Sequence, residues 1–300
     1  MHPAPSIIVF TVLSGLGLGM IAWIGLGLGD GHLAGWVTAP AAILVTALGG
    51  VASVGHLGRP DRAWRAFSQW RSSWLSREAC LMIGAVGVFT VYAALWLLTD
   101  TRIAVLGWLS AALALATVYA TAMIYAQLRT VPRWSAAPTG WLFLVLALAG
   151  GLLADSALLG LAGLPVNGLY VLCWLAGAAG VTVWWQTQAA GARRGYYGSS
   201  GETATGLSGQ VRQLEPPHTG SNYLLREMAY QVGRARAFQL RQIGAFLGFV
   251  LPLVLALLSL GIGGWALALA LLCHVPGMLA LRWLFFAEAE HVQAIYYGQR

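Results

Sequence analysis

The residues of this chain best suited to proton chemistry are a histidine and a glutamate that flank a basic, tryptophan-rich loop. His56 ends the second of a series of apolar stretches, and Glu78 begins the third. If both stretches are antiparallel membrane helices, the two side chains lie on one side of the membrane, with Arg59 and Arg77 close by in sequence. Histidine titrates near neutral pH, and a carboxylate at the membrane edge relays protons to water. A quinone site needs this chemistry, with His56 and Glu78 as its catalytic pair.

The loop between them supplies the aromatic side chains that a quinone ring requires. Residues 57–78 hold three tryptophans and five arginines. On an α-helix, the aromatic residues would share one arc of about 120°: Trp64, Phe67, Trp70 and Trp74. We therefore expect an amphipathic segment in the membrane interface, with Arg59, Trp74 and Arg77 joining His56 and Glu78 in binding the quinone. The alternative interpretation is an interfacial histidine beside a surface Glu–Arg pair.

Composition indicates that most of the chain lies in lipid. Hydrophobic residues make up 58% of the 300 residues and charged residues only 9%, whereas soluble proteins carry about 25% charged residues. Eight stretches are long enough to cross a bilayer, and they must be helices because lipid offers the backbone no hydrogen bonds. They are Ile7–Leu28, Val37–Val54, Ala79–Leu98, Ile103–Leu128, Trp141–Leu161, Gly168–Gln188, Ile243–Leu260 and Trp265–Phe286. We predict an all-α integral membrane protein, a single domain over residues 1–300 containing a bundle of eight transmembrane helices.

The arginines are distributed unevenly between the two sides of this bundle. The net charge of +7 comes from 17 basic residues, all of them arginine. Only Arg102 lies in a connection after the first, third, fifth or seventh span. The positive-inside rule then places the arginine-rich side and both termini in the cytoplasm. Within that side, residues 189–242 form a long basic loop that we expect to dock a partner protein; nucleic-acid binding is not expected.

Other polar residues within the predicted spans have two interpretations each. His274 lies in the middle of the eighth span, at a different depth from His56, so the pair is unsuited to ligating haem and His274 is interpreted as a packing or polar-network residue. Asp155, late in the fifth span, is either a functional intramembrane carboxylate or, the interpretation we favour, an interfacial residue where the span ends. Tyr125 and Gln186, near the ends of their spans, either line the same cleft as Glu78 or anchor helices at the interface.

The cysteines and the known short motifs point to no further cofactor in this chain. Cys80, Cys173 and Cys273 are far apart, and no C-x-x-C occurs, so no iron–sulfur cluster is expected and all three are interpreted as small buried hydrophobic residues. No P-loop, G-x-S-x-G or H-E-x-x-H motif is present, and no metal site is predicted.

Several motifs resemble the membrane-anchor subunits of dimethyl sulfoxide reductase and its relatives. The most specific are His56-Leu57-Gly58-Arg59-Pro60, Ala63-Trp64-Arg65-Ala66 and Ser73-Trp74-Leu75-Ser76-Arg77-Glu78. Weaker matches are His2-Pro3-Ala4-Pro5-Ser6, and Leu225-Arg226-Glu227-Met228 followed by Val232-Gly233-Arg234. Together with the number of spans and the length, the resemblance covers nearly the whole chain.

The resemblance implies an anchor that carries no haem and is not itself catalytic toward the soluble substrate. Such anchors hold a molybdopterin catalytic subunit and a four-cluster iron–sulfur subunit at the membrane, and they exchange electrons between ubiquinone or menaquinone and the nearest cluster. The family's quinol-binding histidine and acidic residue carry over to His56 and Glu78. The arginine bias favours the branch whose catalytic subunits face the cytoplasm and oxidise sulfite. The chain is then expected to reduce quinone in the inner membrane of a bacterium.

Two alternatives remain open at this stage. In the first, electrons flow the other way, and quinol oxidation feeds reduction of an S- or N-oxide. In the second, the chain is a transporter or assembly protein without a redox role, which predicts charged or broken helices at the middle of the membrane.

Overall fold

The computed structural model describes residues 3–55, 57, 59–195, 200–212, 214–215, 220 and 236–293. In these ranges the chain is helical without any strand, and eight helical segments are long and apolar enough to cross a membrane. They are α1 (Pro5–Gly25), α2 (Gly31–Val54), α3 (Trp74–Thr99), α4 (Ala104–Ala126), α5 (Thr139–Leu161), α6 (Gly168–Gly195), the continuous α9 (Ala237–Ala245), η3 (Phe246–Val250) and α10 (Leu251–Ile262), and α11 (Trp265–Ala287). The predicted fold class is therefore confirmed.

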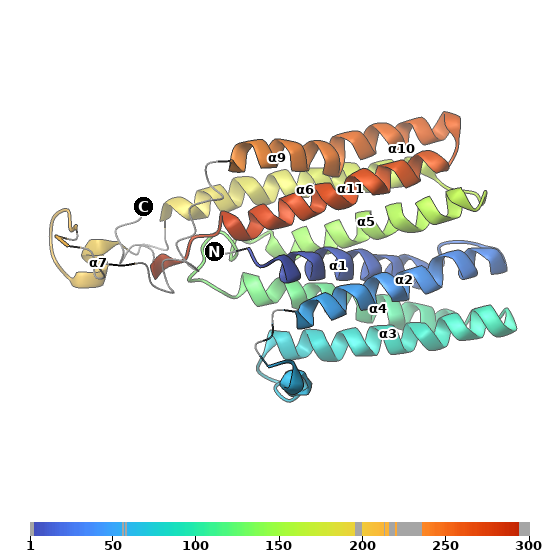
Figure 1. Cartoon of the computed structure of the whole chain (residues 1–300), viewed down its shortest axis with the longest axis horizontal. Helices are drawn as coiled ribbons and strands as arrows, with labels where there is room; N and C mark the ends of the chain where they lie inside the picture. Colours follow the sequence, from blue (N-terminus) through green and yellow to red (C-terminus); the bar gives the residue numbers. More distant parts are fainter. Residues whose placement is uncertain are drawn as a thin grey trace.

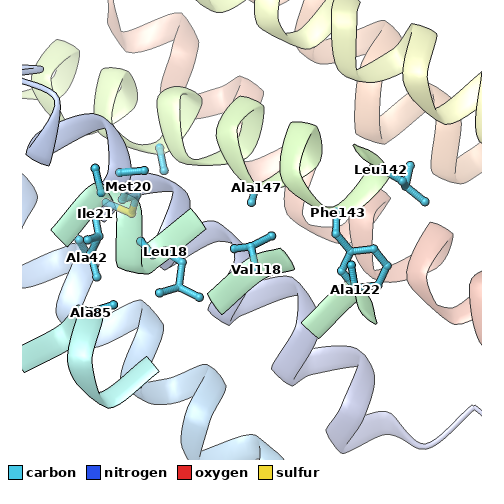
Figure 2. Packing of buried hydrophobic residues seen from close by; sticks show 14 of the residues in the cluster. Leu18, Met20, Ile21, Ala42, Ala85, Val118, Ala122, Leu142, Phe143 and Ala147 are labelled. Atoms are coloured by element: carbon cyan, nitrogen blue, oxygen red, sulfur yellow. The ribbon is translucent and has the colours of Figure 1, made fainter. Parts of the chain in front are cut away.

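The eight segments lie side by side along the long axis of the molecule (Figure 1). The connections α1–α2, α3–α4, α5–α6 and α10–α11 gather at one end, and the arginine-rich connections gather at the other (Figure 1). α1 and α5 are the most enclosed spans, and α1 packs against α2, α4, α5 and α11. In Figure 2, Leu18 and Ile21 of α1 belong to one buried cluster with Ala42, Val118 and Ala147 from three other helices.

Small residues allow α1 and α5 to touch backbone to backbone. A Cβ atom added to Gly19 would lie 1.8 Å from the carbonyl oxygen of Ala147, and one added to Gly151 would lie 2.2 Å from the carbonyl carbon of Gly19. Close backbone approach of this kind is the usual way in which helices associate in lipid, because burial of apolar surface does not favour helix association there. The centre of the bundle therefore depends on the absence of side chains at these two positions.

Arg102 lies at the end of the bundle opposite the arginine-rich connections, and it has a structural role. Its guanidinium donates hydrogen bonds to the carbonyl of Gly29 at 2.7 Å and to the hydroxyl of Tyr92 at 3.0 Å. It also lies 4.1 Å from the ring centroid of Trp96. The charge thus ties the α1–α2 connection to α3.

The described residues of the loop 57–78 do not form one continuous α-helix, on which the expected aromatic arc depends, and the interfacial position of the segment remains a prediction. Pro60 opens a short 3-10 helix, η1 (Pro60–Phe67), the chain then turns, and Trp74 begins α3 after the N-cap Ser73. Proline fixes the backbone at the start of a helical turn, whereas the N-cap serine starts a new helix in a new direction. The four aromatic residues therefore do not share one helical face.

Only parts of the long loop 189–242 belong to the described ranges. α6 continues to Gly195, α7 (Gly201–Thr205) is a single turn closed by a capping box from Ser200 and Thr203, and α9 begins at Ala237. Residues 216–219 and 221–235 of the loop lie outside the described residues. Docking of a partner on this loop remains a prediction.

The interpretation of the cysteines as buried residues is wrong. Cys80 and Cys173 are exposed on the surface of the bundle, and Cys273 is partly exposed. They lie on helix faces that contact lipid in a membrane, where a small apolar side chain is equally well accommodated.

Candidate functional site

Glu78 is buried at the arginine-rich end of the bundle. It lies one turn into α3, is 5% exposed, and contacts the hydroxyl of Thr121 on α4. That hydroxyl also lies 3.1 Å from the carbonyl oxygen of Thr117. When Glu78 is ionised, Thr121 donates to it; when Glu78 is protonated, it donates to Thr121, which donates to the carbonyl. Both protonation states are hydrogen-bonded, as reversible proton transfer requires. Because the carboxylate is buried against α4, the alternative of a surface Glu–Arg pair does not hold.

An aromatic cluster with a buried guanidinium adjoins this carboxylate. Tyr125 of α4 is 8% exposed and lies one turn after Thr121, the residue that contacts Glu78. The Arg282 guanidinium lies 3.9 Å from the ring centroid of Phe143, and Tyr125 stacks on the same ring at 5.8 Å. Cation–π contacts stabilise a guanidinium away from water. The site therefore combines a buried acid, a phenol and a cation among aromatic walls.

The predicted quinone-binding residues are distributed around this centre rather than gathered in it. Trp74 is half-buried and meets Tyr119 edge to face at 6.1 Å. Arg77 lies 4.4 Å from the Trp74 ring centroid and donates to the carbonyls of Trp70 and Arg71 at 3.0 and 2.6 Å, so it fastens the loop to α3. We call the group above Glu78 the Trp74 lip; it consists of Trp74, Arg77 and Tyr119.

One other member of the predicted set, Arg59, does not join the Trp74 lip. Arg59 is exposed and pairs with Asp61 at 3.3 Å, so its side chain is occupied at the outer surface. His56 lies outside the described residues. Its part in the site remains a prediction.

A cavity of about 70 Å³ opens inside the bundle beside Glu78. Side chains of α1, α4, α5, α6, α9 and α11 form its wall, and Thr121 is part of it. The lining includes ten polar side chains: Thr11, Ser14, Thr121, Arg133, Thr182, Gln186, Arg241, His274, Arg282 and Glu288. Of the residues predicted from sequence, Gln186 and His274 belong to this wall. The others come from six segments spread over the chain, and no sequence motif links them.

An ionic cluster lines the outer end of this cavity. Glu288, which follows α11, contacts Arg133 of the α4–α5 connection at 2.5 Å and also pairs with Arg241 of α9. The Arg241 side chain is 38% exposed, whereas those of Arg133 and Glu288 are 9% and 12% exposed. One carboxylate therefore joins three parts of the chain where the cavity reaches the surface.

His274 lies at the inner end of the cavity, near the middle of α11. Its side chain is 2% exposed, and Nδ1 lies 2.7 Å from the carbonyl oxygen of Gly248. The α-helical donor to this carbonyl would be the N–H of residue 252, but that residue is proline, which has none. The π-helical turn η3 lies at the same place. His274 thus satisfies a carbonyl that the helix leaves open, in agreement with a polar-network role.

The interpretation of Asp155 as an interfacial residue at the end of its span is wrong. α5 continues to Leu161, and Asp155 is completely buried. Neither of its carboxylate oxygens has a hydrogen-bond partner among the described residues. Because it is completely buried, Asp155 is an interior residue rather than an interfacial one. A carboxyl group at such a position is costly.

The comparisons with known proteins agree with this architecture. The family described as DMSO reductase anchor subunit (DmsC) matches residues 1–187. Over 332 aligned positions, which cover 99% of both chains, the sequence is 34% identical to the C-subunit of sulfite dehydrogenase from Allochromatium vinosum.

Proposed function

Because the chain belongs to the family of DMSO reductase anchor subunits, we propose that it is the quinone-reactive membrane anchor of a sulfite-oxidising molybdoenzyme. As an anchor, it holds a molybdopterin catalytic subunit and an iron–sulfur subunit at the membrane. The match to a sulfite dehydrogenase subunit over 99% of both chains supports sulfite as the substrate of the complex. Family membership also favours this role over that of a transporter.

The observation that carries the quinone assignment is the buried Glu78 with its hydrogen bond to Thr121. Oxidation of sulfite to sulfate, with water supplying the added oxygen atom, releases two electrons and two protons, and reduction of a quinone to a quinol takes up two of each. The electrons come from the iron–sulfur partner. Glu78 gives a proton to a quinone oxygen held under the Trp74 lip, and we assign the second proton to His56. The aromatic rings of Trp74 and Tyr119 supply the apolar contact that the ring needs.

The distribution of arginines supports an inner bacterial membrane with the partners in the cytoplasm. The start of α3, which carries the Trp74 lip, the end of α11, which Glu288 follows, and α7 of the long loop all lie at the arginine-rich end (Figure 1). Basic segments stay in the cytoplasm during membrane insertion. The same end therefore receives electrons and protons from one compartment.

The family description also supports the opposite direction of electron flow, from quinol to the catalytic subunit. DMSO reductase anchors give the family its description, and the same site would oxidise quinol if the catalytic subunit reduced an S-oxide. Glu78 would then accept a proton instead of donating one. Assays of the purified complex with sulfite and with an S-oxide separate the two directions.

The test of the proposed function uses the whole complex purified in mild detergent. We expect a molybdopterin polypeptide without a twin-arginine leader and a cysteine-rich polypeptide to co-purify with this chain, and sulfite to reduce an added quinone. Glu78→Gln should lower quinone reduction by about 100-fold or more, while sulfite oxidation with a soluble dye as acceptor stays unchanged. Normal quinone reduction by the Glu78→Gln complex would refute the site.

A further inference from the structure

The burial of Glu78 raises the question of how a proton reaches it. At 5% exposure the carboxylate has almost no contact with water. If Glu78 delivers a proton to a quinone in every turnover, it must be reprotonated in every turnover. A route for protons from the arginine-rich surface is therefore necessary.

The volume of the cavity fits water better than a quinone ring. A cavity needs about 10–15 Å³ to hold a water molecule, whereas an apolar cavity known to bind benzene has a volume of about 150 Å³. At about 70 Å³, this cavity has room for several waters but not for an aromatic ring. Its ten polar side chains provide the hydrogen bonds that such waters require.

The lining of the cavity extends from the partly exposed ionic cluster at Glu288 to Thr121, the residue that contacts Glu78. Its outer end is bounded by Glu288 and Arg241, whose side chains are partly exposed. Its wall includes Thr121, whose hydroxyl contacts the Glu78 carboxylate. Thr121 thus lies between the cavity and the carboxylate and can pass a proton through its hydroxyl.

We propose that this cavity is a hydrated proton path that leads from the arginine-rich face to Glu78 through the hydroxyl of Thr121. The inference rests on the proposed function, since it assigns a route to the proton that Glu78 transfers. In it, Thr121 is a positioning residue, and Glu78 is the group that meets the quinone. Glu288, which pairs with two arginines, forms the mouth of the path.

The charged groups along the path direct the proton toward Glu78. Arg282 lines the cavity and lies near Tyr125, and its positive charge disfavours an excess proton resting in the water. The ionised carboxylate is then the favourable end point. His274 closes the inner end, about 20 Å along α11 from Glu288.

The path can be blocked without disturbing the helices around it. Gly15 lines the cavity, and a Cβ atom added there meets no atom within 4 Å. Gly15→Leu therefore places a side chain in the space assigned to water. We expect quinone-linked sulfite oxidation by the complex to fall about tenfold or more, with a larger solvent deuterium isotope effect, because proton delivery becomes the slow step.

Two controls separate a blocked path from a damaged fold. Gly177→Leu on α6 also places a Cβ where no atom lies within 4 Å, but Gly177 does not line the cavity, so quinone turnover should stay at the wild-type level. Thr121→Val removes the hydroxyl while keeping the shape, and it should reproduce the effect of Gly15→Leu. Thr121→Ser should restore turnover, and dye-linked sulfite oxidation should be normal in every variant.

The outcomes distinguish this inference from the proposed function. If Glu78→Gln abolishes quinone reduction but Gly15→Leu and Thr121→Val behave like Gly177→Leu, the site stands and the proton path is refuted. If Glu78→Gln reduces quinone normally, the proposed function fails first. Should Gly15→Leu not assemble, the Thr121→Val and Thr121→Ser pair decides alone.

Discussion

The contact between α1 and α5 makes one glycine far more sensitive to substitution than its neighbour one turn away. A Cβ atom at Gly19 would lie 1.8 Å from the Ala147 carbonyl oxygen, whereas one at Gly15 meets nothing within 4 Å. Real Cβ atoms essentially never come closer than 3.0 Å to another heavy atom, so Gly19→Ala must separate the helices by about 1.2 Å. A gap of this size forfeits up to about half of the dispersion energy along the contact.

The magnitude follows from comparing the two substitutions. Overpacking against a rigid backbone costs about 3 kcal/mol or more, while replacing a helical glycine by alanine returns about 1 kcal/mol. We expect Gly19→Ala to lower the free energy of unfolding by about 2 kcal/mol or more. Gly15→Ala should leave it unchanged or raise it by up to about 1 kcal/mol.

The assay is unfolding of the purified chain in mixed micelles of increasing denaturing-detergent content, followed by helical circular dichroism. Gly15→Ala is the matched control, because it lies on the same helix and makes the same chemical change. Equal stability of the two variants would refute the close contact between α1 and α5, and with it the packing at the centre of the bundle.

Two further predictions concern the buried polar residues. His274→Asn keeps a donor near the position of Nδ1 and should retain most of the stability, whereas His274→Leu leaves the Gly248 carbonyl unpaired and should cost about 1–3 kcal/mol in the same unfolding assay; identical losses would exclude the hydrogen bond as the cause. Asp155→Asn should leave the free energy of unfolding within about 1 kcal/mol, because neither carboxylate oxygen has a partner among the described residues. A loss above about 3 kcal/mol would reveal a partner that binds the charged carboxylate.

The sequence alone was enough to predict the number of spans and the side on which α1 begins and α11 ends. Both depend on quantities that act locally along the chain. A run of apolar residues long enough to cross a bilayer must be helical, and an even number of spans returns the chain to its starting side. The same reasoning placed Glu78 at the arginine-rich end, because it begins a span that follows a basic loop.

Tertiary structure alone decided which polar residues meet inside the bundle. Thr121, Arg282 and Glu288 come from separate segments, and they reach one cavity only through the rotation and packing of their helices. In water, the apolar face of a helix identifies its buried side, but in lipid the outer surface is apolar as well. For that reason the sequence did not predict the exposure of Cys80 or the burial of Asp155. The burial of Glu78 likewise depends on how α4 packs against α3.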